Sequence, residues 1–455
     1  MHPRFAAVTK AYDVRGRSPE QLDAELVRAF GQAFADEVEI SEGRGAAIIG
    51  HDMRETSPEL ARALSDGIRA RGGDVVLIGL ASTDMLYAAS GRLDLPGVMI
   101  TASHNPAGYN GLKVCRAGAR PIGLDTGLAT IAEAAGELLG TPLTEITGPD
   151  TIGTVTEREF VAEYAQHLLD LAPVEGRRLT VVVDAGNGMA GHTADAVLSR
   201  LDLEVVPMYF ELDGTFPNHE ANPLDNSTLV DLQAEVRSRG ADLGLAFDGD
   251  ADRCFVIDET GEAVAPSAIT ALIASRYLAE QPGATILHNV ICSKSVPEIV
   301  TENGGTPVRT PVGHSLIKAE MARTDAVFGG EHSGHFYFRD FYLADSGMLA
   351  ALHVMAALAE TDRTVSELMA QYGRYPASGE INSTVDDAPT VIERLAETYA
   401  EHDQDRLDGL TVTADTWWFN VRASNTEPLL RLNVEGDDAA TMERVRDEVL
   451  ALIRA

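Results

Sequence analysis

The strongest constraint on the fold of this chain is an alternation of short apolar runs with longer amphipathic stretches. Apolar runs at 46–50, 74–78 and 97–101 are typical of buried strands, and the stretch 57–71 between the first two has helical periodicity. A Ser-Pro pair opens that stretch and suits the N-terminus of a helix. Strands that alternate with helices in this way predict an α/β fold.

The same alternation restarts twice, and a differently built tail follows. A segment rich in Gly, Pro and Asp near 148–153 separates the first round from the second. The second round predicts strands at 179–184, 203–209 and 242–247 and a helix at 227–239. The third predicts strands at 284–290 and 326–329 and helices at 267–279 and 346–360. The tail predicts strands at 415–421 and 429–434 and a closing helix at 439–453.

We therefore expect three successive α/β units and a smaller α+β domain. At ~100–200 residues per domain, 455 residues correspond to three or four domains. The predicted domains are residues 1–150, 151–256, 257–370 and 371–455.

The charge of the chain argues against two classes of partner. The formal net charge of −34 disfavours both nucleic acid and anionic membranes. An acid excess is also typical of proteins from salt-rich habitats. Only four lysines are present, so arginine side chains must provide most contacts to any phosphorylated substrate.

The sequence shows no sign of secretion or membrane insertion. No apolar run reaches the ~18–20 residues that span a bilayer, and residues 1–16 lack the apolar stretch of a secretory signal. Cys115, Cys254 and Cys292 are too few and too widely spaced for a disulfide framework. We therefore expect a cytoplasmic protein.

An acidic loop follows the apolar strand at 243–247. Asp248, Asp250 and Asp252 alternate along a tight turn, where their carboxylates converge on one hard cation. Without His or Cys among them, the three aspartates favour Mg²⁺ over Zn²⁺. The spacing also fits a calcium hand with Glu259 at position 12, but Arg253 occupies the position that needs glycine.

A second polar loop contains Ser103, directly after the strand at 97–101. A side chain at the C-terminal end of a strand lies where open α/β sheets bind ligands. His104 is next to it and can take or give a proton. An ordinary turn, in which Ser103 and Asn105 cap backbone groups, is the structural alternative. The G-x-S-x-G elbow of a serine hydrolase is absent.

Residues 186–191 match the dinucleotide-binding pattern G-x-G-x-x-G, and Glu211 follows about 20 residues later. This pattern leaves an NAD-linked oxidoreductase open as an alternative function. Glycines at such a turn can also serve only to pack a helix closely against a strand.

Two further loops carry groups suited to a ligand. Residues 329–335 combine a carboxylate, a hydroxyl and two imidazoles on a glycine-rich loop, which suits sugar hydroxyls. Residues 422–426 place a guanidinium, hydroxyls and an amide between two predicted strands, which suits a phosphate group. The structural alternatives are a solvated turn and a polar hairpin.

Taken together, the ordered motifs at 11–16, 101–106, 248–253, 330–335 and 422–426 resemble the α-D-phosphohexomutase family. Within it they are most similar to the phosphomannomutase/phosphoglucomutase group, and the resemblance covers the whole chain. It implies three related α/β domains with mixed sheets and a smaller C-terminal α+β domain, arranged around a central cleft.

The resemblance also implies roles for individual residues. Ser103 resembles the phosphoserine, which completes a Mg²⁺ site formed with Asp248, Asp250 and Asp252. The groups that flank the phosphoserine and assist proton transfer are Arg15, His104 and Lys113. The residues expected to bind substrate are Tyr12, Arg253, His314, Glu331, Ser333, His335, Arg422, Ser424, Asn425, Thr426 and Arg431. Many relatives have a basic residue at the position of about Ile291. In this chain either Lys294 provides that contact or the contact is missing.

The implied reaction transfers the serine phosphate to a hexose phosphate, forms a hexose 1,6-bisphosphate, and returns the other phosphate to Ser103. The loop Glu331-His332-Ser333 is more similar to the mannose/glucose group than to the glucosamine group. We therefore expect a phosphomannomutase with phosphoglucomutase activity, with phosphoglucomutase or phosphoglucosamine mutase as alternatives. The expected partners are small-molecule hexose phosphates, and the expected assembly is a monomer or homodimer.

Overall fold

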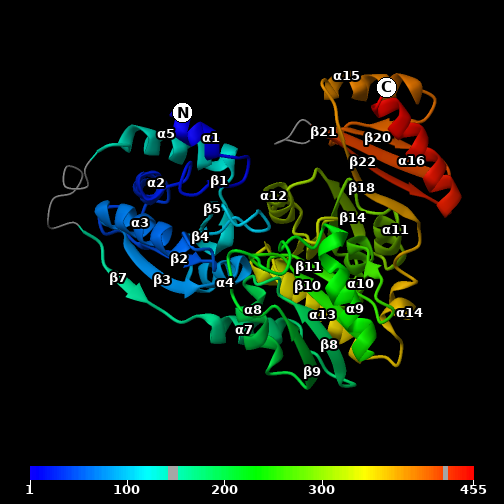
Figure 1. The fold of residues 1–455 in the computed structure, drawn as a ribbon, viewed down its shortest axis with the longest axis horizontal. Coiled ribbons are helices and arrows are strands. Elements are labelled where there is room, and N and C mark those ends of the chain that lie inside the picture. Colours follow the sequence, from blue (N-terminus) through cyan, green and yellow to red (C-terminus); the bar gives the residue numbers. More distant parts are fainter. Residues whose placement is uncertain (142–151, 424–428) are drawn as a thin grey trace. The chain divides into compact units, whose positions relative to one another are not determined.

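The computed structural model describes residues 1–141, 152–423 and 429–455, without the side chains of His314 and Ser315. The chain divides into two compact units. The first comprises residues 1–264 and 333–366, and the second comprises residues 265–332 and 367–455. Helices and strands alternate through most of the chain (Figure 1), which confirms the predicted α/β class.

The first unit begins with a mixed sheet of strand order β1-β5-β4-β2-β3-β7, with β6 paired to β5. β2 runs parallel to β3 and β4, whereas β5 runs antiparallel to β4 and β1. The strands are β1 (Val14–Arg17), β2 (Ala46–His51), β3 (Asp74–Leu80), β4 (Gly97–Ile100), β5 (Tyr109–Arg116), β6 (Arg120–Pro121) and β7 (Val155–Glu157). The helices are α1 (Pro3–Val8), α2 (Ala24–Glu37), α3 (Ser57–Ala70), α4 (Thr83–Leu93) and α5 (Leu128–Leu138).

The core of this part lies between the sheet and the helices α2, α3 and α5, which pack against one another (Figure 1). Phe30 and Phe34 of α2 are fully buried there. Polar residues begin the helices: Asp23 caps α2, and Ser82 caps α4 by accepting a hydrogen bond from the Met85 backbone N–H. The cap at Ser82 matters for the site because α4 contributes Thr83.

A second mixed sheet in the first unit has the strand order β12-β11-β10-β8-β9. β10 runs parallel to β8 and antiparallel to β11, so β10 and β11 form a hairpin around the acidic loop. The strands are β8 (Leu179–Asp184), β9 (Leu203–Met208), β10 (Leu243–Phe247), β11 (Cys254–Ile257) and β12 (Ala263–Val264). The helices are α7 (Val161–Leu171), α8 (Ala190–Leu198) and α9 (Val230–Arg239). The hairpin β16 (Phe336–Phe338) and β17 (Ala344–Asp345) and the buried helix α13 (Gly347–Ala359) complete this unit.

The second unit contains a parallel group of strands and an antiparallel sheet. β13 (Thr285–Asn289) lies between β14 (Thr306–Thr310) and β15 (Phe328–Gly330) and runs parallel to both. The antiparallel sheet has the order β18-β22-β21-β20-β19. Its strands are β18 (Ala377–Thr384), β19 (Asp403–Asp405), β20 (Leu410–Thr413), β21 (Trp417–Ala423) and β22 (Leu429–Gly436). The helices are α10 (Pro266–Glu280), α11 (Ser295–Glu302), α12 (His314–Thr324), α15 (Ala388–Thr398) and α16 (Ala439–Ile453), and α14 (Val365–Met369) lies where the chain leaves the first unit.

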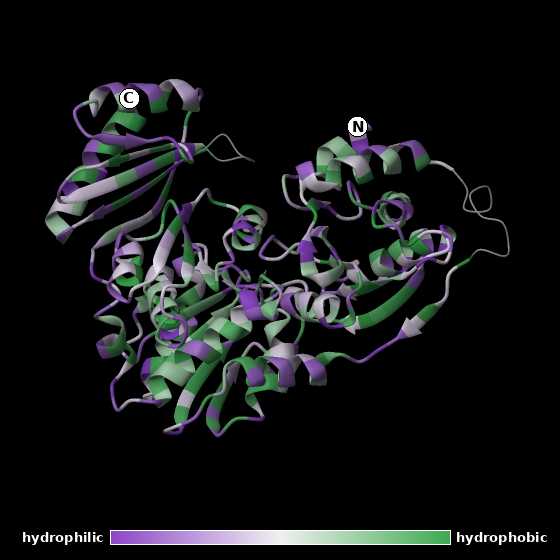
Figure 2. Ribbon diagram, turned by 180° about the vertical axis from the view of Figure 1, so that it is seen from behind, coloured by the Kyte–Doolittle hydropathy of each residue, from purple (hydrophilic) through white to green (hydrophobic). Residues whose placement is uncertain are grey.

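Hydrophobic residues are concentrated in the strands and on the inner faces of the helices (Figure 2). Every residue of β10 is buried, as its continuous apolar sequence predicts. The predicted strand 179–184 and the closing helix 439–453 have the predicted bounds.

Most other predicted elements differ from the observed ones by one or two residues at their ends; the strand predicted at 415–421, for example, is Trp417–Ala423. Two more of these differences are specific. The predicted helix 227–239 starts with a 3₁₀ turn, Asn226–Leu229, because Asp225 caps that turn by accepting from the Ser227 backbone N–H. The predicted strand 326–329 is limited to Phe328–Gly330. The predicted domain boundaries stay a prediction.

Candidate active site

Ser103 lies in the loop after β4, the central strand where the first sheet changes from parallel to antiparallel pairing. Its backbone has a φ of 51°, which is unusual for a residue other than glycine, and only 4% of its surface is exposed. The Ser103 backbone N–H donates to Thr101 Oγ1 at 2.9 Å. Unusual backbone conformations of this kind cluster at functional sites because the surrounding structure must hold them.

Arg54 holds the Ser103 loop from beneath, and the sequence analysis missed it. Its guanidinium donates to the carbonyl oxygens of Ser103 (2.9 Å), Asn105 (2.6 Å), Pro106 (2.8 Å) and Tyr109 (2.9 Å). The side chain is 1% exposed. The only local signal was an arginine in a short polar segment after a predicted strand, and this pattern alone does not reveal four distant carbonyl partners.

Asp52 pairs with this buried arginine. One carboxylate oxygen lies 3.2 Å from Arg54 Nε, and the other accepts from Ser57 Oγ at 2.6 Å. Burial raises the pKa of Asp52, although Arg54 and Ser57 act in the opposite direction. The ion pair lets the fold keep a guanidinium inside the protein, where an unpaired charge would be costly.

The acidic loop between β10 and β11 brings its three carboxylates together. Asp248, Asp250 and Asp252 are all buried, and one oxygen of each lies within 4.8 Å of the others. The Ser103 hydroxyl donates to Asp248 Oδ2 at 2.7 Å. The structure therefore brings the predicted serine and the predicted metal ligands into direct contact within one unit.

Gly249 allows the two loops to approach this closely. A Cβ at this position would lie 2.4 Å from the Ser103 carbonyl oxygen, closer than any real contact. Gly188 of the dinucleotide-like pattern packs on the other side, where a Cβ would lie 2.8 Å from the Gly249 carbonyl oxygen. A Cβ at Gly191 would lie 2.2 Å from the Phe210 carbonyl oxygen. Gly188 therefore serves close packing against the acidic loop, and Gly191 serves close packing against the segment that follows β9.

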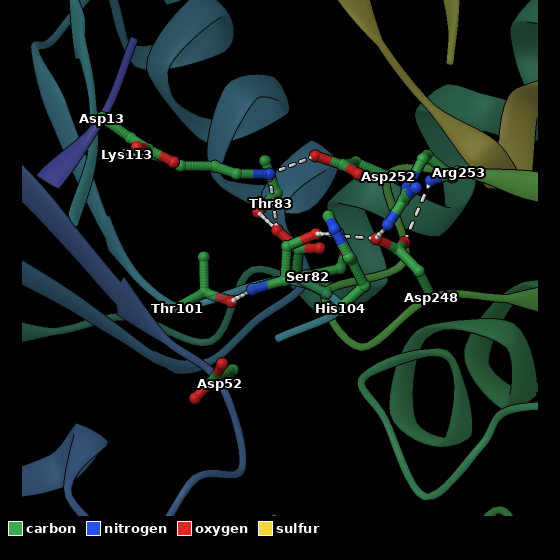
Figure 3. A network of polar contacts seen from close by, with 12 residues as sticks. Asp13, Asp52, Ser82, Thr83, Thr101, His104, Lys113, Asp248, Asp252 and Arg253 are labelled. Atoms are coloured by element: carbon green, nitrogen blue, oxygen red, sulfur yellow. Dashed lines mark hydrogen bonds and ion pairs between the residues drawn. The ribbon is translucent and has the colours of Figure 1, made fainter. Parts of the chain in front are cut away.

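Two cations contact the three carboxylates (Figure 3). Lys113 Nζ lies 2.7 Å from Asp250 Oδ2 and also contacts Asp252 Oδ2. Arg253 donates through Nε to Asp248 Oδ2 at 2.9 Å. Three carboxylates against two cations leave one negative charge, which a divalent cation offsets.

The pKa values reflect this crowding of charge. Burial alone would lower the pKa of Lys113, but Asp250 and Asp252 outweigh it and raise that pKa well above its ordinary value. Burial and the negative charge of Asp250 raise the pKa of Asp252 to about 7. Lys113 therefore stays protonated, while the carboxylates compete for the same positive charge.

The residues present fit an oxygen-ligated cation. Among the residues that the structure describes, the buried atoms Asp250 Oδ1 and Asp252 Oδ1 have no hydrogen-bond partner. Carboxylate oxygens without nitrogen or sulfur ligands suit a hard cation such as Mg²⁺. The calcium-hand alternative does not fit, because strands flank the loop and Glu259 accepts a hydrogen bond from the Ser366 backbone N–H at 3.1 Å.

Two more predicted residues contact the Ser103 loop, His104 at Ser103 Oγ and Arg15 at Asn105. His104 Nδ1 lies 3.2 Å from Ser103 Oγ. Burial lowers the pKa of His104 well below its ordinary value, and Arg253 and Arg15 lower it further, so the imidazole is neutral at pH 7. Arg15 on β1 donates to Asn105 Oδ1 at 2.5 Å and to Asp13 at 2.5 Å. Tyr12 precedes β1 and is half-buried.

Two contacts at the acidic loop were not predicted. Thr83 Oγ1 at the start of α4 donates to Asp250 Oδ2 at 2.5 Å. His335, whose role in binding substrate stays a prediction, also lies beside this loop: its Nδ1 is 3.0 Å from Asp345 and 3.7 Å from Asp252. Burial would lower the pKa of His335, but Asp252 and Asp345 outweigh it and raise that pKa. His335 thus belongs to the surroundings of the carboxylates.

The remaining predicted residues lie mostly in the second unit. Glu331, at the end of β15, is 2% exposed, and its Oε2 accepts from Asn289 Nδ2 at 3.1 Å and from the Gly313 backbone N–H at 3.3 Å. Arg422 and Arg431 both contact Glu380, a residue that the sequence analysis did not consider. Ser333 is half-buried and opens the segment 333–366 of the first unit. The predicted residues Ser424, Asn425, Thr426 and the side chain of His314 lie outside the described part of the chain.

Lys294, which was expected to replace a basic residue near Ile291, has other contacts. Its Nζ lies 2.5 Å from Asp437 Oδ1 and 3.9 Å from the centre of the Tyr375 ring. Ile291 itself is buried. Whether Lys294 also contacts substrate stays a prediction.

No helix in the described parts of the chain is long and apolar enough to cross a membrane.

Comparisons with known proteins agree with this arrangement. Family models for the phosphoglucomutase/phosphomannomutase α/β/α domains I, II and III match residues 6–138, 158–261 and 265–375, and the model for the C-terminal domain matches residues 380–452. A phosphohexose mutase from Xanthomonas campestris is 40% identical over 451 residues, which are 98% of each chain. A phosphomannomutase from Escherichia coli is 40% identical over 458 residues, again 98% of each chain.

A solved structure of the same family is similar along the whole chain. The crystal structure of a phosphoglucomutase/phosphomannomutase family protein from Burkholderia thailandensis is 31% identical and superposes with a TM-score of 0.89. The match covers 100% of this chain and 98% of that one. A serine in contact with a buried aspartate loop, on a chain that matches all four domain models in order, therefore makes this protein a member of the phosphoglucomutase/phosphomannomutase family, a family of phosphohexomutases.

Proposed function

We propose that this chain is a phosphomannomutase that interconverts mannose 6-phosphate and mannose 1-phosphate and also acts on glucose phosphates. The observation that carries the proposal is the 2.7 Å hydrogen bond from Ser103 Oγ to Asp248 Oδ2, which joins a candidate phosphate carrier to a candidate metal site. The names of the relatives support the substrate class.

In the proposed reaction Ser103 carries the phosphate. A free hydroxyl of the hexose phosphate attacks phosphorus, the bond from phosphorus to Ser103 Oγ breaks, and a hexose 1,6-bisphosphate forms. Ser103 Oγ takes up the proton that the attacking hydroxyl loses. In the return step Ser103 Oγ attacks the other phosphate, and neutral His104, whose Nδ1 lies 3.2 Å away, accepts the hydroxyl proton. The departing sugar oxygen takes up the proton that Ser103 has lost, which leaves His104 neutral again.

Asp248, Asp250 and Asp252 are the residues that would hold Mg²⁺. The cation offsets charge on the transferring phosphate when it is bound. Lys113 and Arg253 contact the same carboxylates, so they keep the loop compact and add positive charge beside Ser103. Arg15 orients Asn105 in the serine loop through its 2.5 Å hydrogen bond.

The sugar and the phosphate that stays in place are assigned to other proposed residues. Glu331 and Ser333 would read sugar hydroxyls, and Arg422 and Arg431 would bind the second phosphate. Mannose and glucose differ at C2, and a site without a partner for that hydroxyl discriminates by only ~1–3 kcal/mol. This is why we propose activity on both sugars. We also propose hexose 1,6-bisphosphate as intermediate and activator.

The three cysteines are buried thiols that are not joined by disulfide bonds, which favours a reducing compartment, and we propose the cytoplasm.

Replacing the carrier tests the reaction. We expect Ser103→Ala to lose nearly all mutase activity and its phosphate label, while its melting temperature stays close to that of Ser238→Ala, an exposed serine on α9. Turnover of Ser103→Ala at the wild-type rate would remove Ser103 as the carrier.

Comparing kcat/KM for mannose 1-phosphate, glucose 1-phosphate and glucosamine 1-phosphate tests the substrate. We expect the first two to be used with comparable efficiency and the third poorly. A clear preference for glucosamine 1-phosphate would contradict the proposed substrate while leaving the transfer chemistry intact.

A further inference from the structure

The antiparallel sheet of the second unit places two like charges opposite each other. Arg422 on β21 is the direct register partner of Arg431 on β22. Directly opposed side chains share one face of the sheet with Cβ atoms ~4.5–5.5 Å apart, and like charges at such positions repel. The pair is therefore stable only if another group offsets its charge.

Glu380 on β18 provides that group. β18 pairs with the other edge of β22, with Asn382 opposite Arg431, so Glu380 two residues earlier shares the face of Arg431. Its Oε2 accepts from Arg422 Nη2 at 2.8 Å, and its Oε1 lies 3.3 Å from Arg431 Nη1. One carboxylate therefore joins both guanidinium groups in a row across three strands.

The backbone before Glu380 is irregular. The pairing of β18 with β22 shifts register between Ala377 and Glu380, and Gly379 within this bulge has a φ of 66°. Bulges change the direction of the following side chain and often occur beside functional sites. The bulge thus sets where the Glu380 carboxylate points.

The Arg422 side chain has a donor left over among the described contacts. Arg422 is 9% exposed and Glu380 is 14% exposed, so water screens their interaction only weakly. Each guanidinium has five N–H donors, and Glu380 contacts one nitrogen of each. Within the described part of the chain, the buried Arg422 Nε has no hydrogen-bond partner. Two cations and one carboxylate leave a net positive charge that can attract an anion.

We propose that Glu380 is a positioning residue that holds Arg422 and Arg431 side by side, so that the pair receives the hexose phosphate group that is not being transferred. This inference rests on the proposed function. Without the carboxylate, repulsion drives the two guanidinium groups apart, and a phosphate must first bring them together. Glu380 contacts one nitrogen of each arginine, so a single carboxylate orients both guanidinium groups.

The variant Glu380→Gln tests this role. The glutamine amide has one acceptor oxygen, which can serve one guanidinium group. Its NH₂ group is a donor and cannot accept a hydrogen bond from the second guanidinium group. We expect the apparent KM for mannose 1-phosphate, at a fixed concentration of hexose 1,6-bisphosphate, to rise about tenfold. We expect kcat to change by less than about threefold, because the interaction helps to bind both ground state and transition state.

Two further variants serve as controls. Glu393→Gln removes a carboxylate from an exposed pair with Arg406 in the same domain and should leave KM unchanged. Glu380→Asp keeps the charge on a shorter side chain and should give a KM between those of wild type and Glu380→Gln. If Glu380→Gln does not fold, as judged by its melting curve, then Glu380→Asp decides, and a wild-type KM there overturns the proposal.

Other outcomes separate the positioning role from the phosphate site. An unchanged KM in folded Glu380→Gln overturns the positioning role, and a lowered KM would mean that Glu380 competes with the phosphate. If Arg422→Lys raises KM while Glu380→Gln does not, the phosphate site stands and only the positioning role fails. If both variants keep the wild-type KM, the proposed phosphate site fails as well.

Discussion

The buried guanidinium of Arg54 should control both the stability of the first unit and the position of Ser103. Replacing it by methionine keeps much of the volume but removes four hydrogen bonds to loop carbonyls and the partner of Asp52. Removing one partner of a buried ion pair costs about 3–5 kcal/mol because the other charge is left uncompensated. At ~2–4 °C per kcal/mol for a domain of this size, Arg54→Met should lower the melting temperature by roughly 6–20 °C.

The effect on activity should exceed the effect on folding. The Ser103 and Asn105 carbonyls are tied directly to Arg54, so the loop that carries Ser103 Oγ should shift when the guanidinium is lost. A displacement of about 1 Å can cost on the order of 100-fold in rate. We therefore expect kcat at 20 °C, where the variant stays folded, to fall by about two orders of magnitude.

The assay combines thermal unfolding with steady-state kinetics. Arg62→Met is the matched control, because Arg62 is an exposed arginine on the neighbouring helix α3. Arg54→Lys should be intermediate, since an ammonium keeps the charge beside Asp52 but has only three donors. A melting temperature of Arg54→Met within ~2 °C of the control corresponds to a loss of less than about 1 kcal/mol. If the variant also kept full kcat, the guanidinium would not hold the loop.

Three further predictions concern the metal, the packing of the loops and pH. EDTA should abolish turnover, and Mg²⁺ should restore it. Mg²⁺ should also raise the melting temperature of wild type but not of Asp250→Asn. Metal-independent turnover would contradict the carboxylate site. Gly249→Ala should reduce kcat by roughly 100-fold, because its Cβ would lie 2.4 Å from the Ser103 carbonyl oxygen, whereas Gly108→Ala meets open space and should be nearly silent. Asp84 is buried in the first turn of α4, and burial raises its pKa to about 6, so the folded state prefers the protonated form and loses about 2 kcal/mol of stability as the pH rises from 4 to 7. Measured by urea unfolding, the stability of Asp84→Asn relative to wild type should therefore improve over that interval, and a pH-independent difference would refute the assignment.

Much of the architecture follows from local sequence patterns. The run at 179–184 is a strand with those bounds because a short, continuous apolar segment between polar ends has few other ways to be buried. The helix 227–239 was less well predicted, because Asp225 caps a 3₁₀ turn and delays the α-helix to Val230. Side-chain hydrogen bonds of this kind depend on only a few atoms and leave little trace in the periodicity.

The parts of the candidate site also differ in how well the sequence predicts them. The three aspartates are close in sequence, so their convergence could be predicted from spacing alone. The residues that surround these aspartates could not be predicted from spacing, because Thr83 comes from α4 and His335 from the segment before β16. Only the folded chain brings these segments within hydrogen-bond distance.

Local sequence patterns therefore specify the order of the α/β units, the serine loop and the acidic loop, because each is a pattern of neighbouring residues. The contacts by which Arg54 ties down the Ser103 loop and Glu380 joins Arg422 and Arg431 become visible in the folded chain. Those contacts link residues 42 to 55 positions apart, and no local pattern encodes such a distance. Sheet topology and register bring these residues together, because they determine which strand ends lie side by side and which side chains share a face of the sheet.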